Sequence, residues 1–126
     1  MTQSFDSSHR QLIVIGDRVL IRPDLPDERT KVGLYLPQTV VGKEEIRSGH
    51  IVSVGPGIAT SEIEVSNDEP WRTDQRRGVR YIPMQAEEGD YALFLRKAAF
   101  EIKFDGEDLL VVPQSAVLVL LRDFHQ

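Results

Sequence analysis

Short runs of alternating apolar and polar residues recur along the chain, and turn-forming residues separate them. In the clearest case Phe100, Ile102 and Phe104 alternate with charged residues, and Asp105-Gly106 follows directly. Alternation of this kind predicts half-buried strands, and Asp-Gly favours a two-residue hairpin turn. From such alternation, or from short apolar runs bounded by turns, strands are predicted over residues 12–15, 18–22, 50–54, 79–82, 91–96, 100–104, 109–112 and 117–121.

A helical period is not sustained over three turns anywhere in the sequence, although residues 113–115 suit a single helical turn. Turn signals such as Gly16-Asp17, Gly55-Pro56-Gly57 and Gly89-Asp90 interrupt the chain at short intervals. We therefore predict an all-β protein, either a barrel or a sandwich.

The first and last predicted strands are apolar on both faces, which is unusual for an antiparallel strand with one wet face. An apolar strand at a sheet edge promotes aggregation unless something covers it. Pairing of the last strand of one subunit with the first strand of the next would cover both and close a ring. Alternatively, both strands are central in one barrel. The residues concerned are Leu12, Ile13, Val14, Ile15, Val117, Leu118, Val119, Leu120 and Leu121.

The composition narrows the class of protein. With 126 residues, 40 % of them hydrophobic, the chain suits one domain over residues 1–126 with a modest core. It has no cysteine, and its net charge of -5 disfavours nucleic acid and anionic lipid as partners. Residues 1–10 read as a polar, flexible lead without the apolar run of a secretory signal. We expect a cytoplasmic protein without a membrane span.

The segment between the second and third predicted strands, residues 24–49, is long for a connection in a compact domain. Polar and charged residues surround an apolar triplet, Leu34, Tyr35 and Leu36, which Gly33 precedes and Pro37 follows. Exposing large apolar side chains gains nothing for a linker, so the pattern predicts a binding loop. The alternative is that Leu34 and Leu36 fold back onto the barrel as an ordinary strand.

Four blocks of sequence in order resemble the GroES-type co-chaperonins, the chaperonin-ten family. They are residues 15–21 (IGDRVLI), 52–57 (VSVGPG), 88–94 (EGDYALF) and 102–112 (IKFDGEDLLVV). The loop 24–49 lies where that family carries its mobile loop, and Gly33, Leu34, Tyr35 and Leu36 match its chaperonin-binding glycine and apolar tripeptide. The chain departs from the pattern in having Val32 in place of a second glycine and a bulky Tyr35 in the middle of the tripeptide.

This resemblance implies a small GroES-like β-barrel that assembles as a seven-membered ring and assists protein folding. The ring would cap a GroEL-type double-ring chaperonin, which itself holds the nucleotide, so no cofactor, metal or catalytic residue is expected in this chain. Subunits would join through the first strand of one and the last strand of the next. Residues 58–86, longer than the family norm, would form the roof hairpin. An alternative is a divergent ring or adaptor that binds another partner through this hairpin.

Features typical of an enzyme or a nucleic-acid binder are weak. His9, His50 and His125 are scattered, and none has the spacing of a metal or catalytic cluster. The only basic cluster includes Arg72, Arg76, Arg77 and Arg80, close to Trp71. Acidic residues on the opposite arm of the same hairpin make cross-strand charge pairing a simpler interpretation than nucleic-acid binding. We predict neither catalysis nor nucleic-acid binding.

Overall fold

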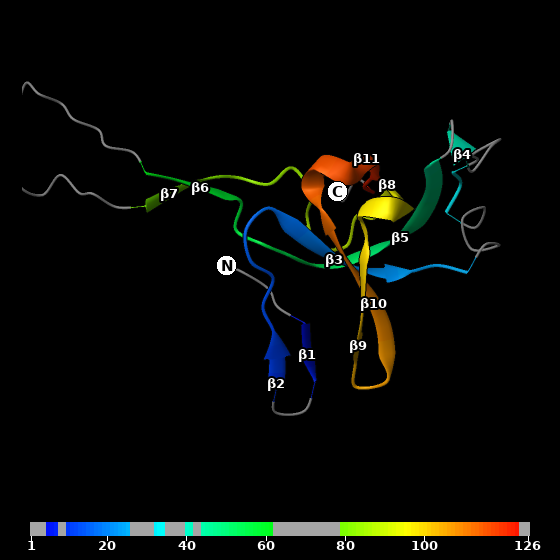
Figure 1. Cartoon of the computed structure of the whole chain (residues 1–126), viewed down its shortest axis with the longest axis horizontal. Coiled ribbons are helices and arrows are strands. Elements are labelled where there is room, and N and C mark those ends of the chain that lie inside the picture. The colour runs from blue at the N-terminus through cyan, green and yellow to red at the C-terminus, as the bar shows by residue number, and fades with distance from the viewer. Residues whose placement is uncertain are drawn as a thin grey trace, which may run out of the picture.

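The structure of the chain, a computed structural model, describes residues 5–7, 10–25, 32–34, 40–41, 44–61 and 79–123. The main sheet is built from β3 (Arg18–Pro23), β4 (Val40–Val41), β5 (Glu44–Val54), β8 (Tyr91–Leu95), β9 (Phe100–Phe104), β10 (Glu107–Pro113) and β11 (Val117–Leu121). Its order is β11-β8-β5-β3-β10-β9, with β4 paired to β5 and every pair antiparallel (Figure 1).

Two small hairpins accompany the main sheet. One pairs β1 (Phe5–Ser7) with β2 (Arg10–Leu12), and the other pairs β6 (Ile58–Ser61) with β7 (Val79–Ile82). Single 3-10 turns, η1 (Arg96–Ala98) and η2 (Gln114–Ala116), precede β9 and β11. The all-β prediction is confirmed. Over the residues that the structure describes, the main sheet ends on β11 and β9, so hydrogen bonds do not close it into a barrel.

The main sheet surrounds a single hydrophobic core. Phe94 is its largest fully buried side chain. The other members of the core cluster come from four strands and from the residues that flank β8 and β11: Val19, Ile21, Ile51, Ala86, Ala92, Leu110, Val112 and Ala116. Strand β8 lies between β5 and β11, and its residues Tyr91, Ala92, Leu93 and Phe94 are all buried. Both faces of this strand are therefore covered, so its side chains do not separate into a core face and a wet face.

Strand β5 begins earlier than the sequence predicts. We expected a strand from His50, but β5 starts at Glu44 and pairs with β8 between Ile46 and His50 before it pairs with β3. Ile46 is the one large apolar residue in this added part, so its alternation is too weak to indicate a strand. The end of the expected loop 24–49 therefore belongs to β5, and the connection narrows to residues 24–43, called the long loop below.

The N-terminal region also differs from expectation. Part of the expected flexible lead forms β1, which pairs with β2 in a register that aligns Phe5 with Leu12. The predicted strand 12–15 is wrong for its last three residues, because β2 ends at Leu12 and residues 13–15 belong to no strand. Within the described residues β1 begins at Phe5, opposite Leu12, and no described strand pairs with residues 13–15. Ile13 and Ile15 are 64 % and 72 % exposed.

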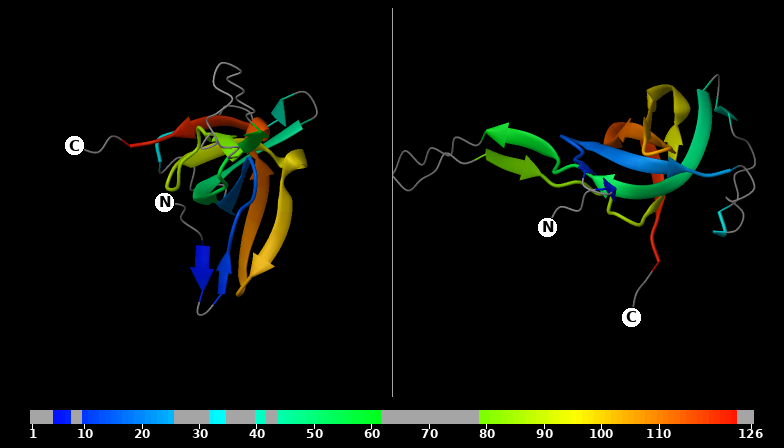
Figure 2. Two further views of the ribbon diagram at one scale, coloured as in Figure 1. Left: turned by 90° about the vertical axis from the view of Figure 1, so that its left-hand side faces the viewer. Right: turned by 90° about the horizontal axis from the view of Figure 1, so that it is seen from below.

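The long loop and the β6–β7 hairpin leave the main sheet at opposite ends, since β4 lies at one end and β6–β7 at the other (Figures 1 and 2). Gly55 and Gly57 fix the start of the hairpin. A Cβ on Gly55 would lie 2.2 Å from the Gly16 carbonyl oxygen, and one on Gly57 would lie 2.0 Å from that of Ile82. Only glycine fits such close approaches of backbone to backbone. The middle of the expected hairpin 58–86 lies outside the described residues.

Candidate functional site: a long loop and an open strand edge

The base of the long loop is held by a small polar cluster. The backbone N–H of Asp24 donates to the Ser48 carbonyl at 3.1 Å, and Ser48 Oγ donates to the Asp24 carboxylate at 3.3 Å. The Tyr91 hydroxyl donates to the same carboxylate. Ser48 and Tyr91 are buried, so the cluster joins the end of β3 to two central strands. The loop therefore starts from a rigid platform.

Strands β3 and β5, which the long loop connects, approach each other closely at Gly49. A Cβ at this position would lie 2.4 Å from the Arg22 carbonyl oxygen and 2.6 Å from the Ile21 side chain. Glycine is thus required where β5 passes the end of β3. At the first residue of β5, Glu44 forms an ion pair with Lys97 at 2.6 Å, which ties the start of the strand to η1. These contacts fix the ends of the two strands that the long loop connects.

The predicted binding residues are only partly within the described chain. Val32 and Gly33 form a turn, and Gly33 has the positive φ of 85° that favours glycine. Leu34 is half-buried and belongs to no strand, so the alternative of an ordinary strand does not hold for this residue. Gly33 is exposed, and a Cβ placed on it would meet no atom within 4 Å. Tyr35 and Leu36 lie outside the described residues.

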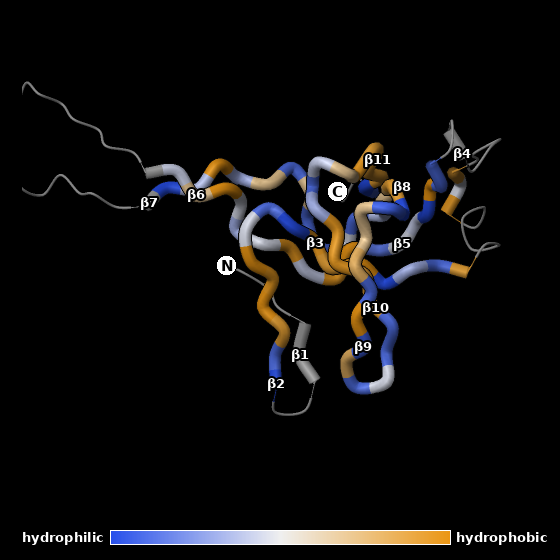
Figure 3. Tube along the Cα trace, in the orientation of Figure 1, coloured by the Kyte–Doolittle hydropathy of each residue, from blue (hydrophilic) through white to orange (hydrophobic). Residues whose placement is uncertain are grey.

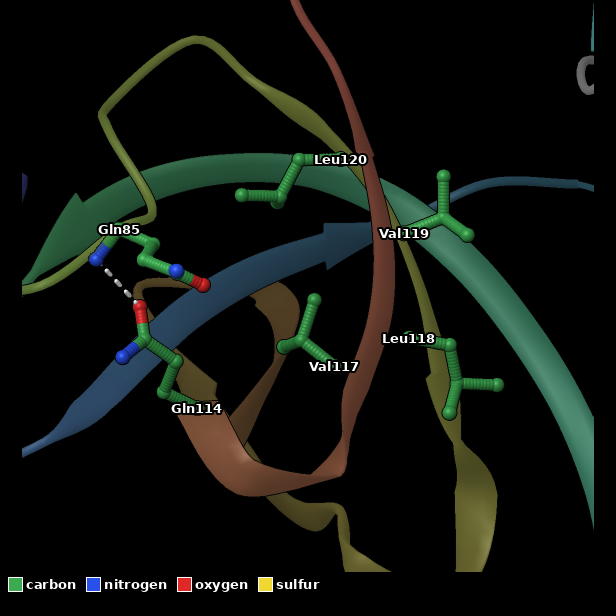
Figure 4. A pocket seen from close by; sticks show the side chains of 6 residues that line it. All are labelled: Gln85, Gln114, Val117, Leu118, Val119 and Leu120. Atoms are coloured by element: carbon green, nitrogen blue, oxygen red, sulfur yellow. Dashed lines mark hydrogen bonds between the residues drawn. The ribbon is translucent and has the colours of Figure 1, made fainter.

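Strand β11 offers an open, apolar edge. Among the described strands it pairs with β8 alone, and its register shifts between Val117 and Val119. Leu118 and Val119 remain 48 % and 46 % exposed, whereas Val117 and Leu120 pack against the core. A shallow pocket follows this edge and is lined by Gln85, Gln114, Val117, Leu118, Val119 and Leu120 (Figure 4). Over the described residues β11 is terminal in the sheet, which favours an edge position for the last strand over a central one.

The open edge of β11 and the β1–β2 hairpin lie on opposite sides of the subunit, and residues 13–15 run from that hairpin toward β3. In Figure 1 and in the left view of Figure 2, β11 is at the top, and the β1–β2 hairpin, from which residues 13–15 continue, is at the bottom. Figure 3 shows residues 13–15 as an apolar stretch between β2 and β3. Two complementary surfaces on opposite sides favour head-to-tail contacts, which close a ring when the rotation allows it.

Hydrogen bonds fix both ends of β11 to the segment before β8. Gln114 Oε1 accepts from the backbone N–H groups of Gln85 at 2.8 Å and Ala86 at 2.9 Å. At the other end, the Arg122 guanidinium donates to both carboxylate oxygens of Asp90, at 2.8 and 2.7 Å, and to the Gln85 carbonyl at 3.0 Å. The edge strand is therefore held in place although it has one neighbour only.

Asp90 is the buried residue of the Asp90–Arg122 ion pair, which we call the anchor of β11, and only 2 % of its surface is exposed. Burial by itself raises the pKa of its carboxyl, but hydrogen bonds from Arg122 and from the Glu87 N–H, together with the charge of Arg122, hold the pKa below its ordinary value. The same contact raises the pKa of Arg122 further above its usual range. Asp90 is thus ionised at neutral pH, and its charge is neutralised by Arg122.

We expect Asp90→Asn to lower the free energy of unfolding at pH 7 by about 2 kcal/mol, because it removes charge-assisted hydrogen bonds at a buried site. The folded-state pKa of Asp90 lies below the unfolded value, so its stabilisation is present above the unfolded pKa and is lost as the pH falls through the folded pKa. The difference between wild type and variant should therefore shrink below about pH 4. Urea unfolding of both proteins, at a fixed subunit concentration and at several pH values in this range, measures the difference in the free energy of unfolding.

Asp108→Asn is the matched control, since it breaks an exposed ion pair with Lys103 at 3.2 Å. Exposed pairs contribute between zero and about 1 kcal/mol, so this variant should differ little from wild type. A difference for Asp90→Asn that is equally small, or that does not change with pH, would contradict the role given to the buried pair.

Sequence reasoning found the loop and the end strands but missed the residues that hold them. Asp24, Ser48 and Tyr91 come from separate segments, and no local pattern indicates that they meet. Arg122 did carry a signal, because it is the first charge after the apolar strand 117–121. A lone cation at that position suggests a buried carboxylate partner near the strand end, and Asp90 supplies it.

Comparison with known proteins places this architecture in a family. Residues 11–70 match the family described as Chaperonin 10 Kd subunit. Co-chaperonin GroES of Rhodothermus marinus is 34 % identical over 109 residues, which cover 86 % of this chain and 90 % of that protein. The chain belongs to the GroES co-chaperonin family. The GroES proteins of Chloroherpeton thalassium and Caulobacter sp. (strain K31) are 30 % and 32 % identical, over 85 % and 86 % of this chain and 94 % of each relative.

Membership of the GroES family confirms the resemblance seen in the sequence and supports a co-chaperonin function. Among the described residues, no group of three or more His, Asp or Glu side chains is placed to hold a metal ion. The described helical segments include none long and apolar enough to cross a membrane. Of the basic cluster, only Arg80 is described, on β7 opposite Thr60. The other arginines on which the nucleic-acid alternative depends, Arg72, Arg76 and Arg77, lie outside the described residues.

Proposed function

We propose that this protein forms a co-chaperonin ring that caps a GroEL-type double-ring chaperonin while the chaperonin holds nucleotide. The observation that carries the proposal is the arrangement of the subunit within a GroES family fold. The long loop and the β6–β7 hairpin leave opposite ends of the sheet, and β11 and residues 13–15 lie on its opposite sides. A ring built through the sides has loops on one face and hairpins on the other.

The binding site in this proposal is Gly33, Leu34, Tyr35 and Leu36. Burying each large side chain in an apolar groove of the chaperonin contributes roughly 2 kcal/mol, or about 6 kcal/mol for the three. Ordering the loop costs on the order of 2 to 5 kcal/mol. One loop alone therefore binds weakly, and several loops on one ring bind tightly because later contacts become intramolecular. A ring bound in this way dissociates when the apolar grooves of the chaperonin change only slightly, because the small change in each contact is multiplied across the ring.

In this proposal the ring has seven members, and each joins the next through residues 12–15 and 117–121. The protein acts in the cytoplasm, performs no chemistry and binds no cofactor, since the chaperonin supplies the nucleotide site. Two observations on the described residues support this: no described strand pairs with residues 13–15, and β11 has β8 as its single described neighbour. Backbone pairing between these segments would satisfy groups that are left open in the isolated subunit.

A second candidate is a ring or adaptor that binds another partner through the β6–β7 hairpin. One observation favours it: Ile58, Tyr81 and Ile82, at the base of this hairpin, are each about half exposed, at 50 %, 50 % and 53 %. Exposed apolar side chains close together are typical of interaction surfaces.

Size-exclusion chromatography of the protein with the chaperonin of its host, with and without ATP, separates the two candidates. Co-elution that requires nucleotide supports the capping function. Absence of a complex in every nucleotide state would exclude capping and leave the adaptor as the remaining candidate.

A further inference from the structure

Most of the β1–β2 hairpin precedes the residues that match the family model. The family match begins at residue 11, so β1 and the first residue of β2 precede it. Figure 1 and the left view of Figure 2 both show this hairpin beside the β9–β10 hairpin, and both hairpins project from the side of the subunit opposite β11. The added segment therefore lies on the side from which residues 13–15 emerge.

Arg10 joins the two hairpins. Its Nη2 atom lies 3.1 Å from Asp105 Oδ1, in the turn between β9 and β10. Its guanidinium carbon also lies 5.4 Å from the centroid of the Phe104 ring, within the range of a cation–π contact. A planar guanidinium makes both contacts at once, with its edge and with its face. We call this pair of contacts the Arg10 latch.

The Arg10 latch fixes one end of residues 13–15, and a backbone hydrogen bond fixes the other. Gly16, which follows them, accepts a hydrogen bond from the Gly57 N–H at 3.0 Å. Ile13 and Ile15 thus belong to a short segment that is held at both ends and that pairs with no strand among the described residues. A segment held in this way loses less conformational entropy when it binds, which is the advantage of preorganisation.

A surface of the same chain fits this segment. The pocket along β11 is open and is lined by the apolar residues Val117–Leu120 together with Gln85 and Gln114 (Figure 4). It lies on the opposite side of the subunit, where a neighbouring copy in a head-to-tail ring would place its residues 13–15. An isoleucine side chain suits such a pocket, and the open backbone of β11 offers hydrogen bonds beside it.

We propose that the β1–β2 hairpin is an assembly clamp, in which Arg10 positions Ile13 and Ile15 for the β11 pocket of a second copy of the chain. Arg10 is a positioning residue here, since it contacts its own subunit and acts through the segment that follows it. This inference rests on the head-to-tail ring of the proposed function. It adds an element, N-terminal to the family match, that prepares the subunit for assembly.

The test is a dilution series of the assembled protein, followed by mass photometry or sedimentation. Arg10→Ala should raise the subunit concentration at which the assembly dissociates by about fivefold, since an exposed ion pair and an exposed cation–π contact are lost. Arg10→Lys keeps the charge, so its assembly should dissociate at a subunit concentration between those of wild type and Arg10→Ala. Lys103→Ala removes an exposed charge from the same β9–β10 hairpin without touching β2, and should dissociate like wild type.

Thermal unfolding in a monomeric background, Val119→Lys, distinguishes positioning from general stability. There Arg10→Ala and Lys103→Ala, which each lose an exposed ion pair within the subunit, should lower the unfolding midpoint by similarly small amounts. Equal dissociation of Arg10→Ala and wild type, or a midpoint that Arg10→Ala lowers far more than Lys103→Ala does, would overturn the assembly clamp while the ring stands. A wild-type protein that is monomeric at every concentration would overturn the head-to-tail ring itself, and the assembly clamp with it.

Discussion

Val119→Lys is expected to convert the ring into monomers that keep the fold. Val119 lies on the open edge of β11, where it lines the pocket and is 46 % exposed in the isolated subunit. A neighbouring chain on this edge would bury the lysine without a partner, which costs several kcal/mol at every interface. Because each subunit carries one such interface on each side, the cost falls on every contact of the ring. Sedimentation gives the mass, and circular dichroism checks the fold.

Leu25→Lys is the matched control for assembly. Leu25 is 64 % exposed and lies at the start of the long loop, away from both proposed interfaces. The same change from an apolar to a charged side chain should leave the ring mass as in wild type. A ring that persists in Val119→Lys, or that is lost equally in Leu25→Lys, would refute assembly through the edge of β11.

Leu34→Ser should abolish capping while the ring mass stays unchanged. Loss of one buried leucine weakens each loop by about 2 kcal/mol, which is most of the small surplus that one loop has after ordering. Since the loops bind together, the loss is multiplied across the ring. Leu36→Ser is expected to act in the same way. Chaperonin binding in the presence of ATP, followed by light scattering, provides the measurement.

Leu25→Ser tests whether the tripeptide or the loop as a whole makes the contact. It removes an exposed leucine from the same loop but from outside Gly33–Leu36, and capping should persist. If Leu34→Ser and Leu36→Ser still cap, the contact lies elsewhere, and the β6–β7 hairpin becomes the first alternative.

The sequence predicts those parts of the fold well whose conformation is decided by residues that are neighbours in the chain. Asp105-Gly106 predicts a two-residue hairpin, and both residues have the positive φ, 51° and 76°, that such a turn demands. The apolar run 117–121 predicts β11 with both of its bounds, since Gln114–Ala116 turns directly before it and Arg122 follows directly after it. In these cases the residues that decide the structure are neighbours in the chain.

The parts that sequence misses depend on distant partners. The first half of β5 contains little apolar alternation, and it is a strand because β8 lies beside it. Residues 13–15 have strong strand propensity, yet none of the strands described in the subunit pairs with them. The polar cluster at Asp24 and the anchor between Asp90 and Arg122 likewise join segments far apart in sequence. Propensity describes what a segment prefers, and tertiary neighbours decide what it adopts.

The orientation of the subunit links the site to the function. The loop starts from a rigid base at Asp24, and β11 is fixed at both ends by Gln114 and Arg122. In the proposed ring, subunits held in this way would let the weak contacts of several loops act together. Under the same proposal the departures at Val32 and Tyr35 lie in the contact with the partner, so we expect them to change the strength or the choice of chaperonin and not ring assembly.

The most direct test of the capping function is electron microscopy of the protein mixed with the double-ring chaperonin of its host in the presence of ATP. We predict a dome on the end of the chaperonin, with the long loops at the contact and the β6–β7 hairpins at the far side. The dome should be absent without nucleotide and absent with Leu34→Ser. A chaperonin that stays bare in ATP, or a complex in which the hairpins make the contact, would contradict the account.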